Sequence, residues 1–159
     1  MADLDPLPVR ASQAEMLELM FPNDANPVGS VMGGRVMHFI DVAAAIVAGR
    51  HAGRSCVTAS VDHLDFHAPV RVGDLLSLKA SVNYVGTTSL EVGVRVEVEN
   101  RFTGGRLHTS SAYLTFVALD EHGRPARVRP VLPESEDEKR RFGEAQKRRA
   151  ERLRARGKA

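Results

Sequence analysis

The stretch PNDANPVGSVMGGRVMHFID, residues 22–41, joins a loop to a helix and contains most of the residues from which fold and function are predicted. Residues 22–34 are dense in Pro, Gly, Asn and Asp, which favour loops and turns. From residue 35 to 49 the apolar side chains follow helical spacing, and three consecutive alanines strengthen the prediction of a helix. Gly49 is the predicted end of this helix. Because few polar residues interrupt any face, we expect the helix to be buried, with His38 and His51 on its flanks.

Four segments that follow this helix have the alternation or the β-branched composition typical of strands, namely residues 56–62, 75–84, 88–100 and 106–119. Residues 9–20 fit either a first strand or a short helix, because their periodicity is weak. The turns between the strands are short, which favours an antiparallel sheet. One buried helix against one curved sheet is an α+β architecture.

The composition is that of one globular domain, with 43% apolar and 26% charged residues in a chain of 159. Cys56 is the only cysteine, which excludes an intramolecular disulfide and argues against a cysteine-based metal cluster. Residues 1–10 contain no apolar run typical of a signal peptide, and residues 36–48 are too short and too polar to span a membrane. We therefore expect a cytoplasmic protein.

The charge is unevenly distributed along the chain. Residues 139–159 contain ten Lys or Arg against two Glu, whereas the remainder of the chain is net acidic. Three prolines between residues 125 and 133 separate the two regions. We predict a folded domain over residues 1–133 and a basic extension over residues 134–159, either a charged helix or a disordered tail. Its predicted i,i+4 ion pairs are Glu136–Arg140 and Glu144–Arg148.

Two features of residues 22–41 point to chemistry. Gly33 and Gly34 stand where the loop becomes a helix, so a ligand can approach backbone N–H groups that have no partner within the helix. A thioester carbonyl placed there would be stabilised as it becomes an oxyanion. Asp41 follows two helical turns later among apolar residues and can act as a general base or attack a thioester directly. The structural alternatives are a flexible helix entry and a carboxylate paired with Arg35 or capping a loop.

Three sequence blocks together resemble the hotdog-fold acyl-CoA thioesterases, the acyl-CoA hydrolase family that includes bacterial short-chain and brain-type cytosolic enzymes. The first block matches at Pro22, residues 24–26, Gly29, residues 32–34 and Asp41. The second is VTASVDHLDFHAPVRVGD at residues 57–74, and the third is the turn at residues 86–89. The blocks occur in the family's order across roughly residues 10–120.

The resemblance implies a hotdog fold, in which a five- to six-stranded antiparallel sheet wraps a long central helix. It also implies hydrolysis of acyl-CoA to free acid and coenzyme A, a reaction of lipid metabolism that needs no cofactor. Two subunits of this family pair edge to edge to form the minimal active homodimer. Three such dimers often assemble into a homohexamer.

By the same resemblance, Asp41 is the catalytic carboxylate, and Asn26 reaches the site from the partner subunit to orient water or the thioester. The region of Gly34, with Gly33, is the implied oxyanion hole. Ser30 stands where several relatives have Asn or Asp, and its hydroxyl is expected to replace that polar contact. Further candidates for contacts with the pantetheine or the phosphates of coenzyme A are Thr58, Arg71, Thr87, Thr88 and Ser89. For the hydroxyls the alternative is an ordinary strand or turn position. The basic extension could also contact the phosphates of coenzyme A, and its alternative is a solvated face.

Other functions remain open from the residues alone. His63, Asp65 and His67 would share one face of a strand and could bind a divalent metal, although we predict no metal because the matching family segment needs none. A hydratase or dehydratase of acyl thioesters would need a His near the helix entry, and residues 22–34 contain none. A non-enzymatic module that binds acyl-CoA or nucleic acid is motivated by the basic extension, which lacks aromatic residues for base stacking apart from Phe142. No motif reports the acyl-chain preference.

Overall fold

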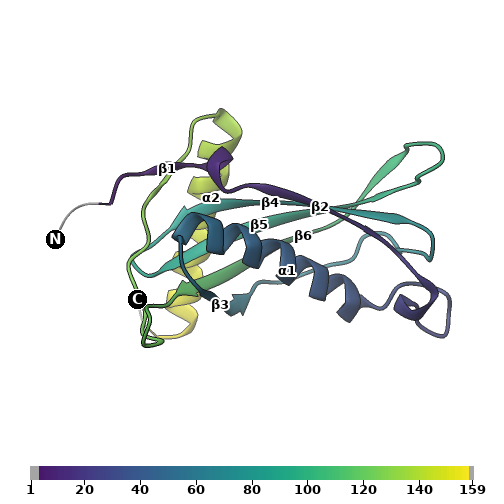
Figure 1. Ribbon diagram of the computed structural model, residues 1–159, viewed down its shortest axis with the longest axis horizontal. Coiled ribbons are helices and arrows are strands. Elements are labelled where there is room, and N and C mark those ends of the chain that lie inside the picture. The colour runs from purple at the N-terminus through teal and green to yellow at the C-terminus, as the bar shows by residue number, and fades with distance from the viewer. Residues whose placement is uncertain (1–3, 158–159) are drawn as a thin grey trace.

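The computed structural model describes residues 4–157 and consists of one five-stranded antiparallel sheet with a long helix on each side (Figure 1). The strands lie in the order β2-β4-β5-β6-β3, with bounds Ala14–Leu19 for β2, Cys56–Val61 for β3, Leu75–Val85 for β4, Ser89–Glu99 for β5 and Arg106–Ala118 for β6. Helix α1 spans Gly33–Ala52 and helix α2 spans Glu136–Ala155. Short elements complete the chain: β1 (Leu7–Pro8) pairs with β7 (Val131–Leu132), and 3-10 turns form at η1 (Val9–Ala11) and η2 (Pro22–Asp24).

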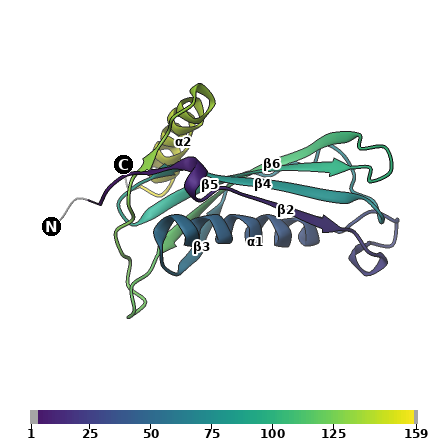
Figure 2. The ribbon, with the colours of Figure 1, turned by 45° about the horizontal axis from the view of Figure 1, so that its top comes forward.

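The core lies between α1 and the concave face of the sheet (Figure 2). The valines of β5 alternate with polar residues, and Val92, Val94 and Val96 are buried against the helix. On α1, residues at helical spacing such as Val36, Ile40, Ala44 and Val47 fill the other side of this core. The α+β architecture and the hotdog arrangement of a long helix with an antiparallel sheet are therefore confirmed, with five strands in the main sheet.

Helix α1 is longer than predicted at both ends. It begins at Gly33 rather than at residue 35, and Gly49 is an ordinary helical residue rather than the end. The helix stops at Ala52 because Gly53 adopts the left-handed conformation, with a φ of 65° and its N–H donating to the Gly49 carbonyl. A glycine just beyond the last turn is the usual way to end a helix, and the chain simply offers two such glycines four residues apart.

The prediction that α1 is buried on every face is wrong for the single subunit. Only the side toward the sheet is covered, and Met37 and Ile46, at opposite edges of the uncovered side, are 44% and 41% exposed. His51, predicted on the flank, is instead buried, with Nδ1 3.3 Å from Ser12 Oγ and Nε2 3.1 Å from the Arg129 carbonyl oxygen. The sheet has too few strands to wrap the helix completely, so an apolar helix face stays open.

Residues 136–155 form a helix that packs on the convex face of the sheet, opposite α1 (Figure 2). Ser135 begins it with a capping box, in which its hydroxyl accepts from the Glu138 N–H while the Glu138 carboxylate accepts from the Ser135 N–H. The ring of Phe142 contacts that of Tyr84 on β4 at 5.1 Å between centroids. The basic extension is thus a docked helix over its described length; residues 1–3 and 158–159 of the two predicted regions lie outside the described residues.

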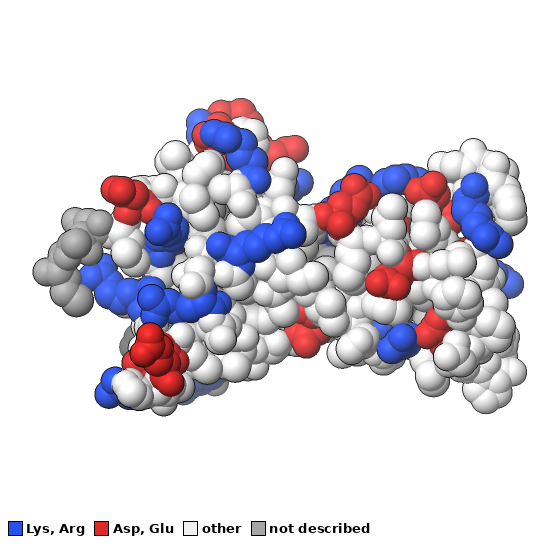
Figure 3. All heavy atoms as spheres, viewed as in Figure 1, with Lys and Arg blue, Asp and Glu red and all other residues white. Residues whose placement is uncertain are grey.

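The predicted ion pairs within α2 are wrong in their register. Arg140 pairs with Glu144 at 3.1 Å rather than with Glu136. Arg148 pairs with Glu91 of β5 at 2.7 Å rather than with Glu144. The periodic charge pattern was predicted for an isolated helix, whereas packing on the sheet redirects one arginine inward. On the face drawn in Figure 3, basic side chains lie in several groups interspersed with acidic and uncharged ones. No helix within residues 4–157 is long and apolar enough to cross a membrane.

Candidate active site

Asp41 lies near the middle of α1, half-buried, at the side of the helix that faces strand β3. Its Oδ1 accepts a hydrogen bond of 2.7 Å from the Thr58 hydroxyl of β3. The alternative of a pair with Arg35 is excluded, because the Arg35 guanidinium binds Asp24 at 2.8 Å. A backbone hydrogen bond from Phe21, followed by this guanidinium, lowers the pKa of Asp24. Asp41 therefore keeps a carboxylate oxygen available for chemistry.

A pocket of about 280 Å³ opens beside this carboxylate. Its lining comes from α1, β3, the following loop and β6, and consists of Met37, His38, Ile40, Asp41, Thr58, Val61, Leu64 and Leu114. The walls are mostly aliphatic, and the polar groups are confined to the Asp41 side. A carboxylate at the mouth of an apolar cavity can act on a bond whose apolar substituent fills that cavity.

The beginning of α1 provides the second predicted element of the site. Gly34 is open, since a Cβ placed there would meet no atom within 4 Å, whereas a Cβ on Gly33 would lie 3.4 Å from the Phe66 ring. Both N–H groups belong to the first helical turn and have no partner within the helix. Gly34 is thus accessible to a ligand, while the small size of Gly33 also serves packing against Phe66. Seven residues of helical rise separate Gly34 from Asp41, about 10 Å along the axis.

The loop before α1 is shaped by Asn26. Its Oδ1 accepts from the backbone N–H groups of Val28 at 3.0 Å and Ser30 at 3.1 Å. Ser30 in turn bridges Arg71, which precedes β4. Asn26, Ser30, Arg71 and Gly34 therefore gather at one end of the molecule. That Asn26 also serves the active site of a partner subunit stays a prediction.

Thr87, Thr88 and Ser89 lie at the opposite end of the same subunit. Strand β4 starts with Leu75 beside the loop that precedes α1 and ends with Val85 beside this turn. There the Ser89 carbonyl accepts from Gly86 N at 2.8 Å, and the Thr88 carbonyl accepts from Ala118 N at 2.9 Å. Within one subunit the turn does not line the Asp41 pocket, and its predicted contact with substrate stays a prediction.

The segment with His63, Asp65 and His67 does not form the strand that the metal alternative assumed. Strand β3 ends at Val61, and these residues follow in an irregular loop where alternate side chains no longer share a face. His63 Nε2 lies 3.0 Å from Asp65 Oδ2, while the His67 ring lies 6.2 Å from that of His108. Within residues 4–157, no three potential ligands are placed to hold a metal ion.

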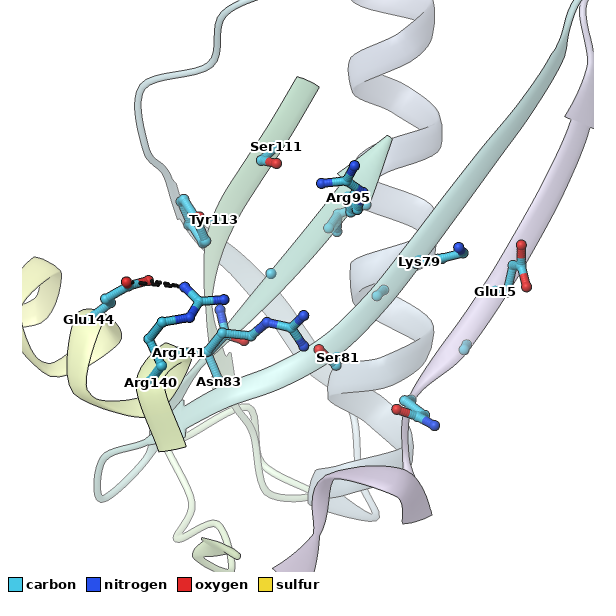
Figure 4. Close-up of a pocket in the computed structure, with 15 residues that line it drawn as sticks. Glu15, Lys79, Ser81, Asn83, Arg95, Ser111, Tyr113, Arg140, Arg141 and Glu144 are labelled. Atoms are coloured by element: carbon cyan, nitrogen blue, oxygen red, sulfur yellow. Dashed lines mark hydrogen bonds and ion pairs between the residues drawn. The ribbon is translucent and has the colours of Figure 1, made fainter. Parts of the chain in front are cut away.

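A larger pocket of about 580 Å³ lies on the convex face of the sheet, between the strands and the start of α2 (Figure 4). Its walls are polar and include Lys79 and Arg95 from the sheet and Arg140 and Arg141 from α2. The sheet separates it from Asp41. None of the residues predicted for the site lies in it, and we place the chemistry in the smaller pocket because that pocket contains the carboxylate.

The sequence reasoning missed two features of the site. The contact of Thr58 with substrate stays a prediction, but the hydrogen bond from its hydroxyl to Asp41 was not foreseen. Val61 and Leu64 were not predicted as pocket walls, because a loop residue and an edge-strand residue carry no periodic signal of what they face. The motif that contains Asp41 carries no information about its hydrogen bond to Thr58 or about the residues that line the pocket.

The chain thus combines a hotdog fold with a carboxylate on its central helix, which a hydroxyl holds beside a largely apolar pocket. The profile of the thioesterase superfamily matches residues 28–103. The uncharacterized acyl-CoA thioester hydrolase YkhA of Bacillus subtilis is 44% identical over 75% of this chain and 69% of its own length. The chain therefore belongs to the acyl-CoA thioester hydrolases of the thioesterase superfamily.

Solved structures agree with this assignment. An apo-hexameric acyl-CoA thioesterase is 41% identical and superposes with a TM-score of 0.92 over 96% of this chain and 97% of that one. An acyl-CoA hydrolase of Staphylococcus aureus, solved with butyryl coenzyme A, is 37% identical with a TM-score of 0.86, covering 95% and 94%. Alanine variants of that enzyme at one aspartate, one asparagine and one threonine have also been solved. The rat cytosolic acyl coenzyme A thioester hydrolase is 36% identical over 88% of this chain, which spans only 37% of that relative's length.

Proposed function

We propose that Asp41 performs the hydrolysis of acyl-CoA thioesters in this chain, with the acyl group in the adjoining apolar pocket. The observation that carries this proposal is the Asp41 carboxylate held at 2.7 Å by Thr58 at the edge of that pocket. As a general base, Asp41 takes a proton from water while the water oxygen adds to the thioester carbonyl carbon. The carbon–sulfur bond then breaks, and the proton passes to the leaving thiolate. No cofactor takes part in this proposal.

The spacing of the residues supports this assignment. In the S. aureus hydrolase the aspartate replaced by alanine follows the replaced asparagine by 15 residues and precedes the replaced threonine by 17. Here Asp41 follows Asn26 and precedes Thr58 by the same intervals. The three residue types that were selected for substitution there thus recur in this chain in the same register.

The separation of Gly34 and Asp41 bears on the mechanism. The two backbone positions are about 10 Å apart along the helix axis. A water molecule activated by Asp41 can add to a carbonyl bound toward the beginning of α1, whereas direct attack would form an acyl–aspartate anhydride. Both routes are compatible with this spacing.

A second copy of the chain is part of the proposal. Strand β3 is an edge of the sheet, and its Val61, on the α1 side, is 44% exposed, while Val57, on the opposite face, is 47% exposed. An exposed apolar edge strand readily pairs with another strand. Pairing of two subunits along β3 would cover Met37, which lines the pocket on this side of α1, and would place the Asp41 pocket at the interface. The hexameric state of two related thioesterases supports an assembly of three such dimers.

In this dimer, Asn26 of one subunit is proposed to orient water or thioester in the other. Arg71 and the turn at residues 87–89 are proposed to contact the phosphates and the pantetheine. A cytosolic role in lipid metabolism is supported by the cytosolic rat, mouse and human relatives. Neither the hydratase nor the nucleic-acid alternative gains support, since within residues 4–157 no His forms a hydrogen bond with Asp41, and two arginines of α2 are paired with Glu91 and Asp62.

The test is thiol release from a series of acyl-CoA esters by wild type, Asp41→Ala and Asp41→Asn. We expect both variants to lose roughly a thousandfold in kcat, within the range for general bases. Asp65→Asn, an exposed carboxylate in the neighbouring loop, is the matched control and should keep wild-type rates. Equal release by wild type and Asp41→Ala would disprove the assignment. Loss of enoyl absorbance from crotonyl-CoA with the thioester intact would instead identify a hydratase.

A further inference from the structure

A buried ionic network outside the candidate site joins α2 to the sheet. At its centre is Glu91 of β5, whose side chain is only 2% exposed on the convex face. Arg148 binds it with two hydrogen bonds, Nη2 to Oε1 at 2.7 Å and Nε to Oε2 at 3.2 Å. Arg152 adds a third at 3.4 Å, and Asn83 a fourth at 3.1 Å. Such a desolvated, multiply bonded carboxylate fixes its partners in position.

Arg152 also holds Asp62, the first residue after β3. Arg152 Nη1 donates to Asp62 Oδ2 at 2.8 Å. The backbone N–H of Asp62 donates to the Tyr113 carbonyl at 3.0 Å, and the Arg148 guanidinium lies 3.7 Å from the centroid of the Tyr113 ring. Asp62 is therefore tied to α2 directly through its carboxylate and indirectly through Tyr113.

Asp62 stands between two walls of the acyl pocket. Val61 precedes it, and Leu64 follows it by two residues; both side chains line the pocket beside Asp41. The Asp62 carboxylate points away from this pocket toward α2, since it binds Arg152 there. The Arg152–Asp62 pair thus anchors the chain at the point where the edge strand becomes the pocket loop.

We propose that Arg152 of the C-terminal helix is a positioning residue that sets the acyl-chain preference by fixing the β3 end of the pocket through Asp62. The inference rests on the proposed function, because it assigns the pocket beside Asp41 to the acyl group. Releasing Asp62 frees Val61 and Leu64 to move, which changes the depth of the cavity. Asp41 and Thr58 belong to α1 and to the earlier part of β3, so the catalytic groups themselves keep their arrangement.

The experiment compares kcat/KM across a series from butyryl- to dodecanoyl-CoA for Arg152→Ala, Arg152→Lys and Asp62→Asn. We expect Arg152→Ala and Asp62→Asn to shift the ratio of long-chain to short-chain kcat/KM by about fivefold, mainly through KM. Arg152→Lys keeps a cation that can reach Asp62 and should restore most of the wild-type ratio. Arg154→Ala, an exposed arginine on the same helix, is the matched control and should leave the profile unchanged.

A double-mutant cycle makes the pairing specific. If Arg152 acts through Asp62, the double variant Arg152→Ala/Asp62→Asn shifts the long-chain to short-chain ratio of kcat/KM no further than either single variant. A merely structural role would lower kcat/KM by one common factor for every chain length, and that result would overturn the proposal, as would an unchanged profile. If Arg152→Ala lowers the folded fraction, Asp62→Asn, which keeps the backbone bond to Tyr113, decides by the same criterion. Asp41→Ala is assayed alongside. If it is inactive while Arg152→Ala keeps the wild-type chain-length profile, only this inference is disproved. If Asp41→Ala is fully active, the proposed function is disproved.

Discussion

The hydroxyl of Thr58 provides the sharpest test of the site, because the structure and not the sequence motif connects it to Asp41. Thr58→Val removes the hydroxyl and preserves the shape of the side chain. The lost bond, 2.7 Å to a carboxylate oxygen, is of the charge-assisted kind that contributes about 1.5–3 kcal/mol. Thr58 is exposed in the single subunit and water can partly replace it, so the lower end applies. About 1.5 kcal/mol corresponds to roughly a tenfold loss in kcat.

The assay is steady-state thiol release on the best acyl-CoA, with kcat and KM determined separately. Because Thr58 orients the carboxylate, we expect the loss in kcat with little change in KM. Thr58→Ser retains the donor and should remain within about threefold of wild type. Ser60→Ala, on the same strand, controls for general disturbance of β3. A wild-type kcat for Thr58→Val, or equal damage from Thr58→Ser, would refute the reasoning.

Three further predictions concern stability. Glu91→Gln removes the buried charge shared by Arg148 and Arg152 and should lower the free energy of unfolding by about 3 kcal/mol in urea titrations, whereas Glu121→Gln in an exposed turn should not. Burial lowers the pKa of His51, so the unfolded chain takes up its proton first. The free energy of unfolding should therefore fall as the pH drops through 6.5, and His51→Gln should flatten this dependence; a steeper decline in the variant would contradict the assignment. Gly53→Ala should cost about 1 kcal/mol because its φ is 65°, while Gly49→Ala in the helix interior should be neutral or stabilising, and equal thermal midpoints for the two variants would count against this view of the helix end.

Periodicity and composition were sufficient for the elements of the fold. Alternating valines predicted β5 to within one residue at each end, and the apolar spacing predicted α1, because both patterns report which face of a local structure is buried. The end of α1 was misjudged, since Gly49 and Gly53 look alike in sequence and only the backbone conformation separates them. The prediction that α1 is buried on all sides is wrong for the single subunit for a related reason. The hydrophobicity of a helix face indicates that the face is covered, but it does not indicate which element or subunit covers it.

The sequence also predicted the reactive group: a carboxylate within an apolar helix, after a Gly-Gly entry and in a segment that resembles known thioesterases, singles out Asp41 as the candidate, and its catalytic role stays a prediction. Its surroundings were decided by tertiary structure alone. Thr58 meets Asp41 across 17 residues, and Arg152 meets Asp62 across 90. Contacts between such distant positions arise from the order of strands in the sheet and from the docking of α2, which no local pattern of residues encodes.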